Sequence, residues 1–239
     1  MIEVRRADER GGADYGWLHT RHTFAFGEYR DPKNVRFRSL RVLNEDRVAP
    51  GAGFPKHGHA DMEILSYVLE GALEHKDSMG NGSVIHAGEL QRMTAGSGVE
   101  HSEKNASAID PVHFYQIWLF PDQKGLEPDY EQRAFDDDEK RGRLRLVASP
   151  DGADGSLRVH QDARIYLTAL AAGESVASSA DPERHLFVQV VQGVVEVNGE
   201  VLAAGDGARL SGEAGLHLIG RENAAETDAP TEALVFDLA

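Results

Sequence analysis

The sequence contains no cysteine, so disulfide bonds, zinc-thiolate sites, iron–sulfur clusters and thiol nucleophiles are excluded. Any metal ion must therefore be bound by nitrogen and oxygen atoms. No long uncharged apolar run occurs either, and charged residues follow Met1 closely, where a signal sequence would be apolar. These absences predict a cytoplasmic protein without a membrane span.

Positive charge is also scarce. The chain has 25 Lys and Arg residues against 40 Asp and Glu residues, a formal net charge of −15. Such a surface repels nucleic-acid phosphates and anionic lipid headgroups, so neither nucleic acid nor a membrane is a predicted partner. With 239 residues, 41% of them hydrophobic, the chain is long enough for one large domain or two small ones.

Several short segments are rich in β-branched or aromatic residues and are bounded by Gly, Pro, Asp or Asn, as strands are. They are Ser39–Asn44, Glu63–Glu70, Phe114–Phe120, Phe187–Val191, Val194–Val197 and Ala233–Leu238. An all-β sandwich or barrel accounts for them most simply.

A change of composition separates two strand-rich regions. The stretch from Pro121 to about Arg143 carries prolines and the acidic run Asp136–Glu139, which is typical of a solvated linker. Within it, Asp136–Arg143 is predicted to form a short surface helix or turn. We therefore expect an N-terminal domain over residues 1–135 and a C-terminal domain over residues 136–239.

The two regions also contain a weak internal repeat. Residues 67–71 (Tyr-Val-Leu-Glu-Gly) match residues 189–193 (Gln-Val-Val-Gln-Gly), and an Ala-Gly-acidic turn follows each, at residues 87–89 and 204–206. Hairpin parts in the same order twice predict a duplicated β-barrel.

Two histidine-containing pairs stand out in the first region. His57 and His59 are two residues apart, as are His101 and Glu103, and in a strand this spacing points both side chains to one face. A lone His-X-His is more often a surface feature, but both pairs follow glycine-containing turns and precede or lie on predicted strands. On neighbouring strands of one barrel, the four side chains would converge and bind a metal ion.

These motifs resemble those of the cupins. Residues 51–71 (Gly-X5-His-X-His-X11-Gly) look like the first cupin motif, and residues 88–105, which contain Thr94-Ala95-Gly96 and His101-X-Glu103-X-Asn105, look like the second motif of pirin-like proteins. The resemblance is strongest to the pirin-like bicupins that include bacterial quercetin 2,3-dioxygenases. It extends over nearly the whole chain through residues 16–18, 22–24, 61–65, 75–81, 116–118, 130–133 and 154–157.

The resemblance implies two cupin barrels and one metal ion bound by His57, His59, His101 and Glu103. Iron(II) is the expected ion, with nickel, cobalt, manganese, copper and zinc as alternatives. Aligned on the shared turns, the second barrel has Ser179 and Asp181 opposite the first histidine pair and Leu218 and Gly220 opposite His101 and Glu103. The C-terminal barrel is therefore expected to be degenerate, with His185 and His217 in structural or surface roles.

The resemblance further implies a dioxygenase that opens a flavonol such as quercetin with dioxygen and releases carbon monoxide. In this hypothesis the substrate's 3-hydroxyl binds the metal as an anion, and Glu103 takes its proton. Two groups of side chains are candidates for supporting roles, although a plain core role is an alternative for each. Trp17, Phe24, Met93 and Trp118 would line the substrate pocket, and His22, Glu63 and Gln116 would hydrogen-bond ligands or substrate.

Two other functional classes stay open. Pirin-like proteins include non-enzymatic regulators whose metal tunes an interaction with a protein partner, and nothing in the sequence excludes this role. A sugar-phosphate isomerase would need a basic cluster to bind phosphate, and only Lys56 and Lys104 flank the ligands.

Overall fold

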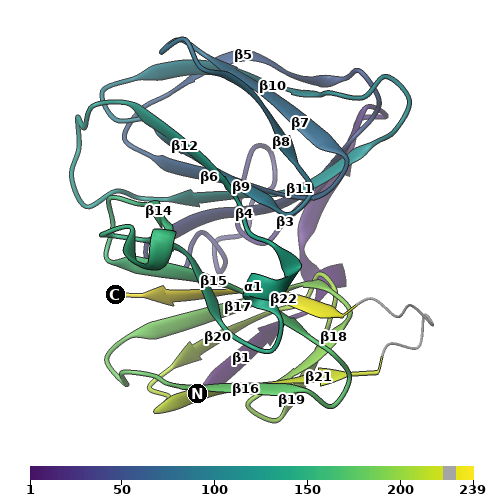
Figure 1. Ribbon diagram of the computed structural model, residues 1–239, viewed down its shortest axis with the longest axis vertical. Helices are drawn as coiled ribbons and strands as arrows, with labels where there is room; N and C mark the ends of the chain where they lie inside the picture. The colour runs from purple at the N-terminus through teal and green to yellow at the C-terminus, as the bar shows by residue number, and fades with distance from the viewer. Residues whose placement is uncertain (223–229) are drawn as a thin grey trace. The chain divides into compact units, whose positions relative to one another are not determined.

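The computed structural model describes residues 1–222 and 230–239 and is built almost entirely of β-strands (Figure 1). The chain divides into two compact units. The N-terminal unit comprises Gly11–Phe135 and Leu157–Gln161, and the C-terminal unit comprises Met1–Arg10, Asp136–Ser156 and Asp162–Ala239. Each unit contains two antiparallel sheets, so the predicted all-β fold is confirmed.

The domain boundary predicted after residue 135 places two short segments in the wrong unit, because residues 1–10 belong to the C-terminal unit and residues 157–161 belong to the N-terminal unit. Strand β1 (Ile2–Arg5) pairs with β20 (Gly207–Ser211) of the C-terminal unit along its whole length. Strand β14 (Leu157–Arg158) lies with the N-terminal unit, where the backbone N–H of Arg158 donates to Glu131. Long-range strand pairing of this kind leaves no local signal in the sequence.

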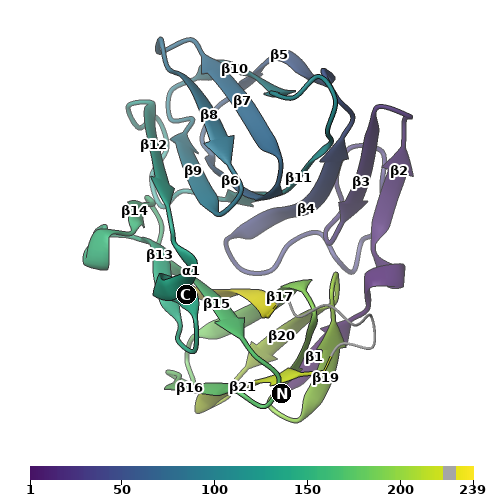
Figure 2. The same cartoon turned by 45° about the vertical axis from the view of Figure 1, so that its right-hand side comes forward.

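In the N-terminal unit, one sheet has the order β12-β9-β6-β11-β4-β3-β2 and the other has the order β5-β10-β7-β8. The two sheets lie opposite each other and enclose the interior of the unit (Figure 2). Their strands are β2 (Gly11–Asp14), β3 (Leu18–His22), β4 (Leu40–Val48), β5 (Gly53–His59), β6 (Glu63–Glu70), β7 (Ala72–Asp77), β8 (Gly82–His86), β9 (Glu89–Thr94), β10 (Val99–Asn105), β11 (Val112–Leu119) and β12 (Asp129–Ala134).

The C-terminal unit repeats this plan. Strands β1, β20, β17, β22, β15 and β13 follow one another in one sheet, and β16-β21-β18-β19 form the other. Their bounds are β13 (Arg145–Ser149), β15 (Ala163–Leu170), β16 (Ser175–Ser179), β17 (His185–Gln192), β18 (Val194–Val197), β19 (Glu200–Ala203), β21 (Gly215–Arg221) and β22 (Thr231–Leu238). Two 3₁₀ turns, η1 (Ala7–Glu9) and η2 (Ala153–Gly155), and the helix α1 (Asp137–Lys140) complete the unit.

The short helix predicted within Asp136–Arg143 is therefore present as α1. Asp136 caps its first turn, and Glu139 reaches back to the backbone N–H of Asp136 in a capping box. No helix in the described ranges is long and apolar enough to cross a membrane.

The turns that suggested a duplication have the same backbone conformation in both units. Gly71 and Gly193 have φ angles of +75° and +76°, and Gly88 and Gly205 have φ angles of +84° and +87°. Such values favour glycine because a Cβ atom would be strained there. A Cβ at Gly71 or Gly193 would also lie within 3 Å of a neighbouring segment, so these positions need glycine for two reasons.

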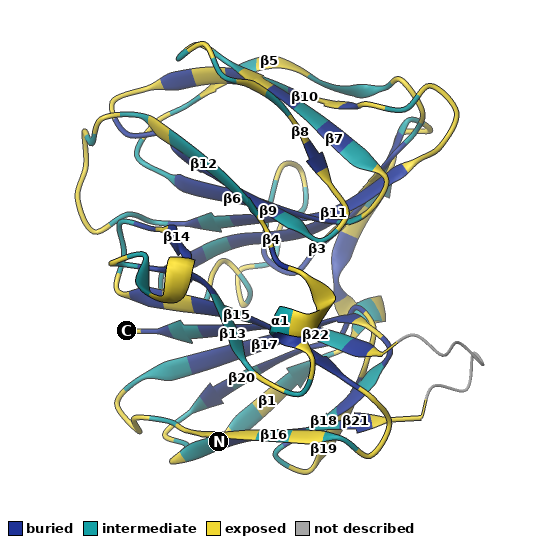
Figure 3. Cartoon of the chain, in the orientation of Figure 1, coloured by how far each residue is buried: buried dark blue, intermediate teal, exposed yellow. Residues whose placement is uncertain are grey.

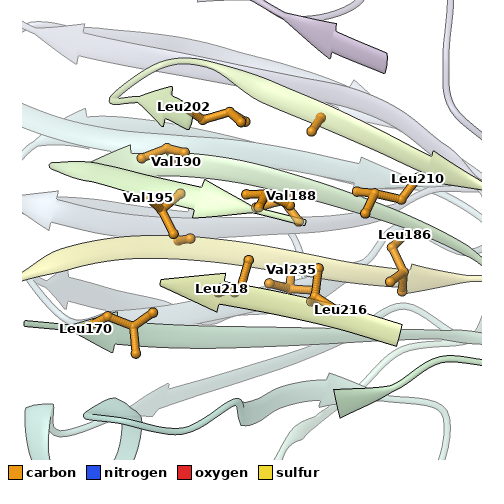
Figure 4. Close-up of a cluster of buried hydrophobic side chains, with 13 residues drawn as sticks. Leu170, Leu186, Val188, Val190, Val195, Leu202, Leu210, Leu216, Leu218 and Val235 are labelled. Carbon is orange, nitrogen blue, oxygen red and sulfur yellow. The ribbon is translucent and has the colours of Figure 1, made fainter. Parts of the chain in front are cut away.

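The interiors of the two units differ in chemistry. The C-terminal unit is filled by a cluster of aliphatic side chains that includes Val188, Val195, Leu218 and Val235 (Figure 4). The N-terminal unit has smaller apolar clusters, and His101, Glu103 and other polar side chains are buried in the same unit. Figure 3 shows that its strands β6 and β11 are mostly buried. Burying polar groups is unfavourable unless they have partners, so this polar interior indicates a functional site.

Candidate metal centre

Two paired strands carry the four predicted ligands. Strands β5 and β10 are antiparallel, and His57 lies directly opposite His101 in their register. Alternation along β10 directs His101 and Glu103 inward, where each is only 2% exposed. The register shifts between His101 and Glu103, close to Pro55, because proline has no N–H group to donate across the ladder.

The three histidines lie together. Their ring centroids are 4.7 Å apart for His57 and His59, 4.5 Å for His57 and His101, and 5.0 Å for His59 and His101. One nitrogen atom from each ring lies within 4.8 Å of the other two. This spacing would allow three imidazoles to bind one metal ion.

The environment keeps two of these imidazoles neutral, which is the form that binds a metal. Burial lowers the pKa of His101 to about 3, and the neighbouring His57 and His75 lower it in the same direction. Burial, His101 and His57 likewise lower the pKa of His59 to about 4. Protons therefore compete weakly for these two side chains at neutral pH.

Hydrogen bonding also leaves nitrogen atoms available for a metal. The Nδ1 atom of His57 donates to the carbonyl oxygen of Pro55 at 2.8 Å, which leaves Nε2 as the free acceptor. Both ring nitrogens of His101 are buried and have no hydrogen-bond partner within residues 1–222 and 230–239. A bound metal ion would satisfy such a nitrogen, so the donor set fits a metal.

Glu103 is held by two side chains from the opposite sheet. Its Oε2 atom accepts a hydrogen bond from Nε2 of Gln116 at 2.9 Å, and its Oε1 atom lies 3.1 Å from the Ser66 hydroxyl. Gln116, which the sequence indicated as a supporting residue, therefore contacts a predicted ligand directly. These bonds orient the carboxylate toward the histidines.

A fourth histidine joins the site. His75 on β7 lies opposite Glu103 in the register of β7 and β10, and it is fully buried. Its Nε2 atom bonds Asp77 at 3.1 Å, and one ligand atom each of His75, His101 and Glu103 lie within 4.8 Å of one another. His75 was not among the predicted ligands, although its two-residue spacing from Asp77 matches that of the other pairs.

Glu63 lies elsewhere. It is three residues from Ser66 on β6, so strand alternation directs it to the opposite face. There it accepts hydrogen bonds from Thr94 and from the backbone of His160, and burial raises its pKa. Its hydrogen bonds therefore connect it to Thr94 and His160 and not to the predicted metal ligands.

The four aromatic and apolar candidates for the pocket lining also differ in whether they lie at the site. Trp118 contacts His59 with a ring-centroid distance of 4.9 Å and so adjoins the site. Met93 and Phe24 are buried core residues, and Trp17 packs edge-on against Phe54.

In the C-terminal unit, Leu218 on β21 lies opposite Val176 on β16, and Ser179 lies opposite Gly215. Because His57 lies directly opposite His101, Ser179 and Leu218 cannot both hold the corresponding positions. His185 bonds Ser211 at 2.8 Å, and His217 is exposed. Among the described residues, the two groups of side chains with the spacing of metal ligands both lie in the N-terminal unit.

Comparison with known proteins connects this geometry to a family. Residues 3–119 match the Pirin family model, and residues 146–238 match the model described as the quercetinase C-terminal cupin domain. The chain is 46% identical over 238 residues to a quercetin 2,3-dioxygenase of Escherichia coli K12, covering 100% of this chain and 99% of the relative. The chain belongs to the pirin family.

Further pirin-family members support this assignment. A pirin-like protein of Caulobacter vibrioides is 40% identical and covers 94% of the chain, with 97% of its own length matched. The crystal structure of the E. coli pirin YhhW with nickel(II) superposes with a TM-score of 0.92 at 44% identity, covering 100% of this chain and 99% of that one. The predicted resemblance and the bicupin fold are thus confirmed.

Proposed function

We propose that this pirin-family protein is a metal-dependent dioxygenase that opens the ring of a flavonol such as quercetin with dioxygen and releases carbon monoxide. One observation carries the proposal. His57, His59 and His101 have the spacing of metal ligands, and His101 also has this spacing with Glu103 and His75, in a chain with full-length relatives named quercetin 2,3-dioxygenase.

The proposed ligands are His57, His59, His101 and Glu103. Three neutral imidazoles and one carboxylate leave a divalent ion with positive charge, and the ion would supply Lewis-acid and oxygen chemistry to a bound substrate. Iron(II) is the proposed ion. The donors do not select strongly among first-row metals, and a related pirin has been crystallised with nickel(II).

Glu103 is the proposed base for the substrate's 3-hydroxyl proton. Its carboxylate is buried, and Gln116 and Ser66 limit its movement, so it can face a hydroxyl group at a fixed position. Deprotonation makes the flavonol electron-rich for reaction with dioxygen. Low exposure to water strengthens each of these interactions.

Contacts at the mouth of the site do not favour a sugar-phosphate isomerase. Lys56 is exposed and forms an ion pair with Glu100 at 2.7 Å, which neutralises its charge. Lys104 is exposed, whereas Glu103 beside it is buried. The two lysines therefore do not form the basic cluster that phosphate binding needs.

The test is anaerobic reconstitution with each candidate metal, followed by measurement of oxygen uptake and carbon monoxide release with quercetin. We expect turnover by the wild type and its loss in a His57→Ala/His101→Ala double variant, together with loss of bound metal. The matched control is His86→Ala/His217→Ala, which removes two exposed histidines. Metal binding without oxygen uptake in any reconstituted form would refute the dioxygenase and favour the regulatory alternative.

A separate measurement tests the role of Glu103. Glu103→Gln keeps the size of the side chain and its oxygen acceptor, but it removes the base. A variant that retains its metal and still oxidises quercetin at the wild-type rate would contradict this assignment.

A further inference from the structure

A cavity of about 340 Å³ opens within the N-terminal unit beside the metal centre. We call it the side cavity. Its lining includes His22, Phe26, Tyr29, Asn44, Asp46 and Phe54. The volume lies within the range of pockets that hold small aromatic molecules.

The side cavity adjoins the proposed ligands. Phe54 lies opposite Glu103 in the register of β5 and β10. On another side, the ring of Phe26 is 5.4 Å from that of Trp118, which in turn contacts His59. The side cavity therefore lies close to the proposed ligands, with Phe54 on one side and Phe26 and Trp118 on the other.

Two hydrogen-bond acceptors in this lining have no partner. Asn44 and Asp46 are two residues apart on β4, so both face inward, and they are 3% and 5% exposed. The Oδ1 atom of each is buried and accepts no hydrogen bond from the part of the chain that the structure describes. The hydroxyl of Thr20 bonds the Asp46 carboxyl group. Buried acceptors without donors are rare in folded proteins, and hydroxyl groups of a bound molecule would supply the donors that these two atoms need.

We propose that Asn44 and Asp46 form a subsite that accepts hydrogen bonds from the hydroxyl groups of a planar polyphenol, at the end of the molecule remote from the metal. The aromatic side chains of Phe26, Tyr29 and Phe54 provide apolar contacts for the ring. The choice of a flavonol as this polyphenol rests on the proposed function. The two free acceptors are observed in the structure and do not depend on that function.

The subsite would determine specificity. A site built to hydrogen-bond a hydroxyl group rejects an analogue without it, because the buried acceptors then stay without donors. Quercetin and 3-hydroxyflavone share the 3-hydroxyl and 4-carbonyl groups that would face the metal. Only quercetin also carries hydroxyl groups on its outer rings, so the pair isolates the contribution of the subsite.

The experiment measures the dissociation constants of both compounds with metal-loaded protein under anaerobic conditions, by calorimetry. We expect the wild type to prefer quercetin. Asp46→Asn replaces one of the two carboxyl oxygens with an amide NH₂ and so removes an acceptor, and Asn44→Leu removes the other free acceptor. Each change should weaken quercetin binding about tenfold and change 3-hydroxyflavone binding less than about twofold. Asp110→Asn, on an exposed loop of the same unit, is the control.

Metal content and melting temperature establish that each variant is folded and loaded with metal. If Asn44→Leu is unstable, Asp46→Asn still tests the subsite, because this change keeps the size of the side chain. Equal losses for both compounds, an unchanged preference for quercetin, or no quercetin binding by the wild type would overturn the subsite. A wild-type preference for quercetin that the two variants lose, without oxygen uptake in air, would support the subsite and refute only the dioxygenase.

Discussion

Replacing Gln116 with leucine should weaken metal binding about tenfold. The change removes the amide that donates to Oε2 of Glu103 at 2.9 Å, at a position that is 8% exposed, where water replaces the donor poorly. A hydrogen bond to a charged group contributes about 1.5–3 kcal/mol, and loss of such a supporting contact typically lowers metal affinity by about 10–100-fold.

Ser66 places the expected effect at the lower end of that range. Its hydroxyl lies 2.8 Å from Oε1 of Gln116 and 3.1 Å from Oε1 of Glu103, but it has only one proton to donate. Without Gln116, that proton is always available to Glu103 and offsets part of the loss. The double variant Ser66→Ala/Gln116→Leu should therefore lose more affinity than the two single variants combined.

The assay is a metal titration in competition with a chromophoric chelator. Gln189→Leu is the matched control, because Gln189 is also buried and donates to the backbone carbonyls of Val190 and Asp206 in the C-terminal unit. Wild-type affinity in Gln116→Leu, or strict additivity in the double variant, would refute the reasoning that Gln116 and Ser66 hold Glu103 in place for the metal.

Three further predictions concern other parts of the N-terminal unit. His75→Ala should lower metal affinity measurably in the same titration, and unchanged affinity would separate His75 from the site. The contribution of His59 and His101 to the stability of the metal-free protein should fall as the pH falls from 6.5 toward 4, because their folded-state pKa values lie below 6.5 and their unfolded forms bind more protons. Burial raises the pKa of Asp46 to about 7, which acts in the opposite direction. Urea unfolding should show a smaller loss over this range in His101→Gln. Gly96→Ala should destabilise the unit by about 1–3 kcal/mol, since φ is +47° and a Cβ atom would lie 2.0 Å from a backbone oxygen, and Gly82→Ala should change the melting temperature much less.

Local patterns were sufficient to predict most of the strands. Glu63–Glu70 and Val194–Val197 match β6 and β18 at both ends, because each is bounded by a turn residue such as Gly71 or Asn198. The segment predicted over Ser39–Asn44 continues to Val48 as β4. Its polar second half gave no apolar signal, since those residues line the interior of the metal-binding unit.

Strand alternation also predicted that the side chains within each ligand pair share a face, because the side-chain period of a strand is two residues. Which face a given polar residue occupies depends on strands distant in the sequence. Gln116 lies opposite Ser66 and reaches Glu103, whereas Glu63 faces away. Both residues are polar and lie on predicted strands, so no local signal distinguished them.

The sequence by itself determined the strands, the glycine turns, the duplicated plan and the two pairs of predicted ligands, because these follow from residues close together along the chain. Only the tertiary structure placed His75 beside Glu103, paired Val176 with Leu218, and enclosed Asn44 and Asp46 in the side cavity. Those arrangements depend on register between strands many residues apart, where a shift of a single residue would turn every side chain to the opposite face.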